Sequence, residues 1–124
     1  MKALSVKQPY AQLICLGLKD IENRNWTTSV RGKIWIHAGK QSDTEARIHL
    51  DMIGCPYPEI SYLYFGALIG TVDFVAVTTH SDSDWFIGKY GFMFENPYLL
   101  NKPIPYKGQL GFFDVDAICL RMVG

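Results

Sequence analysis

Hydrophobic and polar residues alternate over several short segments in the first third of this chain, as is typical of half-buried strands. Residues 2–6 (KALSV) predict a first strand, and residues 20–26 (DIENRNW) and 33–39 (KIWIHAG) predict two more. Alternation places every second side chain on the same face of a strand. In the middle segment, one face therefore carries Glu22, Arg24 and Trp26.

The second half of the chain contains longer segments with strand character. Residues 66–80 (GALIGTVDFVAVTTH) are rich in β-branched residues and are interrupted by glycine, which favours a bent or bulged strand. Residues 90–97 (YGFMFENP) and 108–120 (GQLGFFDVDAICL) predict the closing strands. A proline-broken connection at 55–64 has room for a short helical turn.

Two segments have helical spacing instead. The first helix is expected to begin with Pro9 at its first position and to end at Gly17, and it is apolar on nearly every side, so it should be buried. The second is expected over residues 42–53, with Ser42 and Glu45 as a capping box.

Many curved strands with two early helices predict an α+β, mainly β fold. We expect a small, partly open β-barrel, with the two helices of the N-terminal half flanking it, as one domain over residues 1–124. A doubly wound α/β fold is less favoured, because no helices separate the later strands.

Composition narrows the class of protein. The 124 residues are 48% hydrophobic, enough to fill a core without disulfides or a metal. Cys15, Cys55 and Cys119 are isolated, and no Cys/His spacing suggests a metal ligand set, so we expect no metal, no cofactor and a cytoplasmic location. No apolar run approaches the length of a membrane span, and the first residues do not resemble a signal peptide.

Charge is balanced overall but divided unevenly along the chain. Residues 1–50 hold eight Lys/Arg and four Asp/Glu, whereas residues 51–124 hold four and eight. This asymmetry permits one basic face on a neutral molecule, and it predicts that Lys19, Arg24 and Lys40 converge on one concavity. An unevenly charged but purely solvated surface is the alternative.

One motif carries the most specific signal. GLKDIENR at residues 17–24 has the spacing Gly-x-Lys-x-x-Glu-x-Arg and resembles the signature of the ASCH domain superfamily, relatives of the PUA RNA-binding fold. Further blocks resemble ASCH proteins of this size in the right order, at residues 8–11, 22–26, 31–40, 90–97 and 103–115. The resemblance covers nearly the whole chain.

The resemblance implies a PUA-like β-barrel whose signature residues line a cleft between the first helix and the barrel. It also implies a role around RNA or nucleosides. Family members are proposed RNA binders, some are reported ribonucleases, one bacterial branch hydrolyses N4-acetylcytidine, and the eukaryotic branch includes a domain of a transcription coactivator. Fold alone does not choose among these activities.

The signature residues allow two interpretations each. Lys19 can bind phosphate, or it can act as a base if it is desolvated. The second role is what the resemblance implies, because the corresponding lysine of the amidohydrolase branch is the proposed catalytic residue. Otherwise Lys19 only interacts favourably with the dipole at the C-terminal end of the first helix. Glu22 and Arg24 either contact a ligand or form a structural ion pair. The acetylcytidine-cleaving branch has threonine where this chain has Glu22, which argues against identical chemistry.

Residues outside the signature are weaker candidates. Tyr10, Trp26 and Trp35 can stack on a base, although single aromatic residues more often belong to the core. His37 can act as an acid or base, although a hydrogen-bonded barrel histidine is the more common case. Glu95 is a possible second carboxylate or only part of a turn, and His49 and His80 are expected to be solvated.

The main hypothesis is therefore an RNA- or nucleotide-binding module. The alternative is a small hydrolase, acting on an N4-acetylcytidine-type nucleoside or on RNA, with Lys19 and Glu22 as an acid/base pair. A protein–protein adaptor ranks third. The expected ligand-binding residues are Tyr10, Lys19, Glu22, Arg24, Trp26, His37, Lys40 and Glu95.

Overall fold

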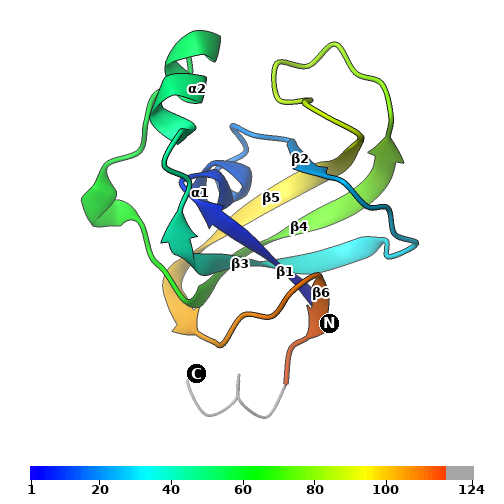
Figure 1. Cartoon of the computed structure of the whole chain (residues 1–124). Coiled ribbons are helices and arrows are strands. Elements are labelled where there is room, and N and C mark those ends of the chain that lie inside the picture. The colour runs from blue at the N-terminus through cyan, green and yellow to red at the C-terminus, as the bar shows by residue number, and fades with distance from the viewer. Residues whose placement is uncertain (117–124) are drawn as a thin grey trace.

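The computed structural model describes residues 1–116. It is mainly β, with two short α-helices beside a curved sheet (Figure 1). The elements in chain order are β1 (Lys2–Gln8), α1 (Tyr10–Cys15), β2 (Ile21–Arg24), β3 (Gly32–Ser42), α2 (Ala46–Ile53), the 3₁₀ turn η1 (Ile60–Tyr62), β4 (Ala67–Thr78), β5 (Tyr90–Pro105) and β6 (Phe112–Asp114).

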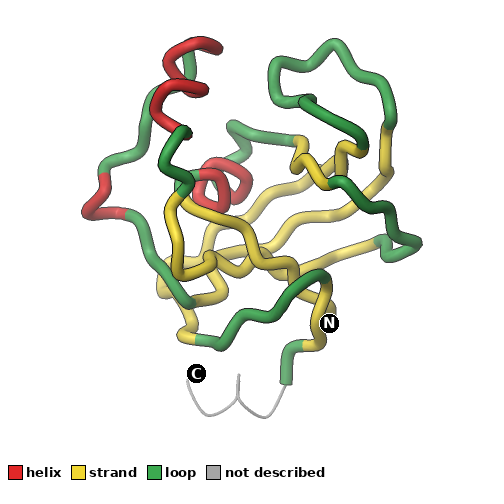
Figure 2. The backbone as a smooth tube through the Cα atoms, in the orientation of Figure 1, coloured by secondary structure: helices red, strands yellow, loops and turns green. Residues whose placement is uncertain are grey.

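Six strands form one mixed sheet in the order β2-β5-β4-β3-β1-β6. β1 runs parallel to β3, and the other neighbouring pairs are antiparallel. The sheet curls (Figure 2), but its edge strands β2 and β6 are not paired with each other. The predicted partly open barrel is confirmed.

The concave side of the sheet holds the main core. Large apolar side chains of β1, β3, β4 and β5 meet there, including Leu4, Ile36, Phe74 and Phe92, each no more than 1% exposed. Helix α1 packs against these same four strands. Its residues Ala11 to Cys15 are buried, as its all-round apolar sequence predicts.

The long strand β4 is bulged against β5 in three places, as its glycines predict. At Gly70 the absence of a side chain lets the carbonyl of Tyr98 and the thiol of Cys15 approach closely. Strand β4 thereby bends around α1.

Strand β5 is longer than the sequence suggested. It continues beyond the predicted end at residue 97, through three prolines, to Pro105. The physical reason is that β2 pairs only with residues 90–93 of β5, so the remainder has a free side. Proline lacks a backbone donor and is tolerated where no partner strand needs one.

Both helices begin later than predicted. Pro9 is the cap residue before α1, and the side chain of Gln8 accepts a hydrogen bond from the Gln12 backbone at 2.9 Å. The predicted capping box of α2 is wrong, because Ser42 is the last residue of β3 and the helix starts at Ala46. Residues 117–120 of the predicted last strand, including Cys119, lie outside the described residues.

Candidate ligand-binding pocket

A concave pocket of about 800 Å³ opens where α1, α2 and the ends of β1 and β2 meet. In Figure 1, α2 and the β4–β5 loop (residues 79–89) rise on either side of α1. Five segments line the pocket. They are β1 (Ser5, Val6 and Lys7), α1 (Tyr10), β2 and the residues before it (Lys19, Glu22, Asn23 and Arg24), α2 and its lead-in (Asp43, Glu45, Ile48, His49 and Met52), and the β4–β5 loop (Ile87).

The end of α1 places Lys19. Gly17 adopts a left-handed φ of +81°, and the backbone N–H groups of Gly17 and Leu18 bond the carbonyls of Ile14 and Leu13 at 3.0 Å. This is the Schellman arrangement that ends helices at glycine. The chain then turns inward, and Lys19 is only 3% exposed. Its ammonium donates to the carbonyl of Ile21 and to Glu22 Oε1 at 3.2 Å.

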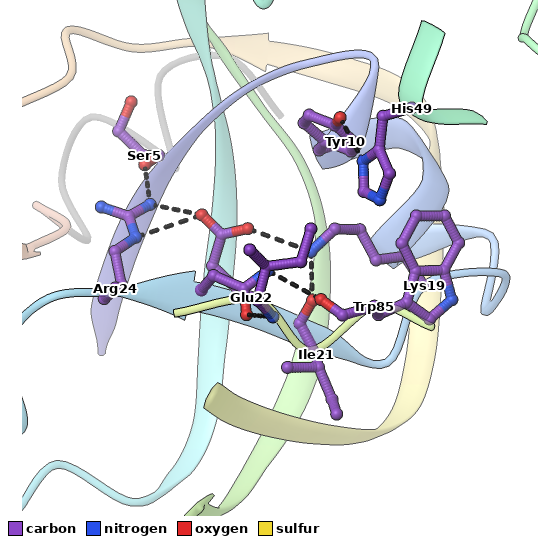
Figure 3. Close-up of polar contacts among 10 residues, drawn as sticks. Ser5, Tyr10, Lys19, Ile21, Glu22, Arg24, His49 and Trp85 are labelled. Atoms are coloured by element: carbon purple, nitrogen blue, oxygen red, sulfur yellow. Dashed lines mark hydrogen bonds and ion pairs between the residues drawn. The ribbon is translucent and has the colours of Figure 1, made fainter. Parts of the chain in front are cut away.

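Glu22 is shared by two cations (Figure 3). While Oε1 faces Lys19, Oε2 accepts from Arg24 Nη2 at 2.8 Å and from Nε at 3.1 Å. Arg24 Nη2 also donates to the backbone carbonyl of Ser5 at 2.9 Å, which ties β2 to β1. The three signature side chains thus form one charge cluster with a net charge of +1.

Burial lowers the pKa of Lys19 from its ordinary value of 10.5, while Glu22 opposes the shift. Two aromatic rings add to its enclosure. The Lys19 ammonium lies 5.4 Å from the ring centroid of Tyr10 and 5.6 Å from that of Trp85. Lys19 therefore sits in a site with few water neighbours, where proton transfer and ligand binding are both chemically feasible.

Tyr10 and His49 form a second pair beside the lysine. The Tyr10 hydroxyl lies 2.8 Å from His49 Nδ1, and the pKa of Tyr10 is raised to about 12 by burial and by nearby carboxylates, first Asp43 and then Glu22. His49 Nε2 is buried without a hydrogen-bond partner among residues 1–116. The prediction that His49 is solvated is wrong, whereas His80 is exposed as expected.

The charge of the pocket is mixed rather than basic. Three cations line it (Lys7, Lys19, Arg24), and so do three carboxylates (Glu22, Asp43, Glu45). Lys40 is exposed near the end of β3 and does not line the pocket. The predicted convergence of Lys19, Arg24 and Lys40 on one basic concavity is therefore wrong, because an acidic segment leads into α2.

Three other predicted residues also lie away from this pocket. Trp26 packs edge-on against Phe92 and Phe112, with ring centroids 5.2 and 5.9 Å apart, and so contributes to the core. Glu95 is exposed on β5 opposite Asp73. Trp35 packs in a second, smaller apolar cluster.

His37 also lies away from the pocket, enclosed in a separate polar network. Its Nδ1 lies 3.0 Å from Ser5 Oγ and its Nε2 lies 2.6 Å from the carbonyl of Tyr106. Because a carbonyl only accepts, the Nε2 carries a proton and Nδ1 accepts from the serine hydroxyl. Burial lowers the pKa of His37, so the ring is neutral at pH 7. His37 is thus a hydrogen-bonded barrel histidine, the more common of the two cases that its sequence position allowed.

The sequence analysis missed several residues at the pocket, among them Asn23, Asp43, His49 and Trp85. Asn23 bridges to the β4–β5 loop, donating to the carbonyl of Trp85 at 2.7 Å and accepting from the backbone N–H of Ile87 at 2.8 Å. The spacing of apolar residues in α2 could have placed His49 on its inner face. Nothing in the sequence relates Trp85 to Lys19, which lies in a distant part of the chain.

Within the described residues, no group of three His, Cys, Asp or Glu side chains is arranged to hold a metal ion. In the same part of the chain, no helix has the length and apolar character needed to cross a bilayer.

Comparison with known proteins identifies the family and supports the fold. The family model of the ASCH domain matches residues 4–109. The human and mouse proteins named activating signal cointegrator 1 are each 29% identical over 133 residues, covering 92% of this chain but 22% of their own length. The chain thus spans about a fifth of these curated relatives.

Two crystal structures of ASCH from Zymomonas mobilis share the fold. The first superposes with a TM-score of 0.59 at 14% identity, covering 98% of this chain and 92% of the other. A mutant form of that protein gives a TM-score of 0.57 at the same identity, covering 98% and 94%. At this level of identity the likeness concerns the fold.

Proposed function

Because the chain belongs to the ASCH domain family, we propose that its pocket binds one unpaired base of an RNA or a free nucleoside. The observation that carries the proposal is the meeting of Lys19, Glu22 and Arg24 with Tyr10 in a single concavity. The resemblance to RNA-associated proteins rests on these same signature residues. The free thiols of Cys15 and Cys55 accord with the cytoplasmic location that we also propose.

The size and lining of the pocket suit such a ligand. A volume of about 800 Å³ falls in the range of small-molecule sites. Arg24 and Lys19 offer donors to a base edge, and Tyr10 offers a ring face next to them. Aromatic stacking on a base contributes about 1–3 kcal/mol.

The balance of charge favours a single base over a long phosphate tract. Lys19 and Arg24 already share Glu22, and the carboxylates of Asp43 and Glu45 repel phosphate on the α2 side. RNA recognition through splayed-out single bases requires few phosphate contacts. Lys7, the third cation that lines the pocket, is available for one phosphate contact.

The test measures binding of cytidine, adenosine and a short single-stranded RNA by calorimetry. If Lys19 contributes charge, Lys19→Arg should keep much of the affinity and Lys19→Met should lose about tenfold or more. RNA affinity should fall with salt with the shallow slope of one or two phosphate contacts. Absence of binding by the wild-type protein to all three probes would overturn the proposal.

A second function has one observation in its favour. The lowered pKa of Lys19 and its contact with Glu22 at 3.2 Å provide a proton donor and acceptor in one buried site. We therefore keep hydrolysis of an N-acyl nucleoside or of RNA, with Lys19 and Glu22 as the acid/base pair, as the alternative. Arginine cannot give up its proton, so turnover that disappears in Lys19→Arg would favour the enzyme over the binding module.

A further inference from the structure

The indole ring of Trp85, in the β4–β5 loop, covers the ammonium of Lys19. The ring lies 5.6 Å from the Lys19 ammonium and meets the His49 ring edge to face, with centroids 5.8 Å apart and planes at 84°. Figure 3 shows Tyr10, His49 and Trp85 grouped around the lysine side chain. These three rings come from α1, α2 and the β4–β5 loop, and with Ile21 and Glu22 they leave Lys19 3% exposed.

The loop that carries Trp85 is held at few points. Of residues 79–89, all are exposed except Ser83, Trp85 and Phe86. The link from β2 to the tip of this loop is the Asn23 side chain, which bonds the backbone of Trp85 and of Ile87. A segment with mostly exposed backbone and few anchors opens at low cost compared with the core.

We propose that Trp85 is a removable cap on Lys19, and that the planar ring of a ligand takes the place of its indole when the loop moves. The cap covers one side of a lysine that also lines the pocket. The part that concerns the ligand rests on the proposed function, whereas the cap itself does not. The ligand ring would lie against the Lys19 ammonium and the His49 ring, as the indole does now.

The unpartnered Nε2 of His49 indicates which hydrogen-bonding group the ligand ring carries on its edge. We assign the Tyr10 hydroxyl as the donor to His49 Nδ1, 2.8 Å away, an arrangement that places the imidazole proton on Nε2. This N–H has no partner within residues 1–116 and is covered while Trp85 is in place. A buried donor without a partner is costly, so a ligand that supplies an acceptor gains binding energy there. The ligand is therefore a planar ring with a carbonyl oxygen or bare ring nitrogen on its edge.

The cap can be tested without any ligand. The protein is treated briefly with the amine-reactive N-hydroxysuccinimidyl acetate, and acetylation of each lysine is followed by peptide mass spectrometry. The exposed Lys33 is the internal reference. Trp85→Ala should raise the rate at Lys19 about thirtyfold, the rate ratio that corresponds to a desolvated cation–π contact, and should leave Lys33 unchanged. Asp82→Ala, at an exposed residue of the same loop that does not line the pocket, is the control and should leave both rates unchanged.

An unchanged rate at Lys19 in Trp85→Ala would overturn the cap. An equal increase in Asp82→Ala would also overturn it, because it would signal general loosening of the loop. Trp85→Phe keeps an aromatic ring and should give an intermediate rate.

A second measurement addresses the ligand. The fluorescence difference between wild type and Trp85→Phe reports on Trp85, and cytidine and adenosine are the probes. Binding with a change in this signal supports displacement of the indole, and binding without one overturns it. No binding to either nucleoside, with the labelling result intact, would count against the proposed function and leave the cap standing.

Discussion

The ammonium of Lys19 lies 3.2 Å from the carboxylate of Glu22, and the two side chains are 3% and 12% exposed. Arg24 occupies the other carboxylate oxygen and is 21% exposed. Removing the shared anion would leave two cations facing each other, one of them buried. Removing Arg24 leaves Glu22 paired with Lys19.

Substitutions in this cluster should therefore have unequal costs. Glu22→Gln should lower the free energy of unfolding by about 3–5 kcal/mol, the usual cost of isolating a buried charge. Arg24→Met should cost about 1.5–3 kcal/mol, because one set of charge-assisted hydrogen bonds is lost. The double variant Glu22→Gln/Lys19→Met should be more stable than Glu22→Gln alone, whereas adding Arg24→Met to Glu22→Gln should not restore stability.

Urea unfolding of the variants measures these differences. Asp114→Asn is the control, because its exposed pair with Lys2 should contribute less than about 1 kcal/mol. Equal small losses for Glu22→Gln and Arg24→Met would contradict the buried-cluster interpretation.

The pairing of Tyr10 with His49 should connect α1 to α2. Tyr10→Phe removes a hydroxyl 2.8 Å from His49 Nδ1 and should cost about 0.5–1.5 kcal/mol in the free energy of unfolding. Tyr62→Phe, at a residue that is 68% exposed, is the matched control and should change nothing measurable. Equal stability of the two variants would show that the Tyr10 hydroxyl does not stabilise the fold.

His37 should make the protein sensitive to mild acid. Burial holds its pKa below the ordinary value of 6.5, so the unfolded chain takes up this proton before the folded one does. The free energy of unfolding should then fall as pH drops below 6.5, while the histidine contributes no pH dependence above it. NMR titration of the His37 ring with parallel unfolding curves checks both points. A folded-state pKa at or above 6.5 would contradict this prediction.

Gly70 should tolerate no side chain. A methyl group there would overlap the carbonyl oxygen of Tyr98 and lie 2.6 Å from Cys15 Sγ. Because backbone cannot move aside cheaply in a packed core, Gly70→Ala should cost more than about 3 kcal/mol or prevent folding. Gly88→Ala is the control, since no atom lies within 4 Å and only its positive φ of +96° opposes the change. A melting temperature for Gly70→Ala close to that of Gly88→Ala would be the contrary result.

Local chemistry in the sequence predicted much of the fold. The end of α1 at Gly17, the burial of that helix and the bulged β4 follow from glycine positions and apolar spacing. The second half of β5 was not predicted, because its prolines are typical of a loop. Only the structure shows that β2 pairs with residues 90–93 alone, which leaves one side of the remaining strand without a partner.

The candidate site was predictable mainly where its residues are close in sequence, and Tyr10 is the one predicted lining residue outside the segment 19–24. Lys19, Glu22 and Arg24 lie within one short segment and were found together. His49 and Trp85 reach Lys19 from distant segments, so no local pattern could link them. Trp26 continues the face of Glu22 and Arg24 in an ideal strand, but β2 ends at Arg24 and the tryptophan turns into the core.

The pairing of β1 with β6 has a consequence for synthesis of the chain. Ala3 lies opposite Phe113, so β1, which precedes the other five described strands, receives its second neighbour only when almost all of the described residues are present. During translation β1 remains unpaired until β3, its parallel neighbour, has been synthesised, and its other side remains unpaired until β6 has been synthesised. Until then it presents an open edge of the kind that recruits strands of other chains. A nascent chain ending at Gly111 should therefore depend on chaperones, and release of the next segment, Phe112–Asp114, should end that dependence.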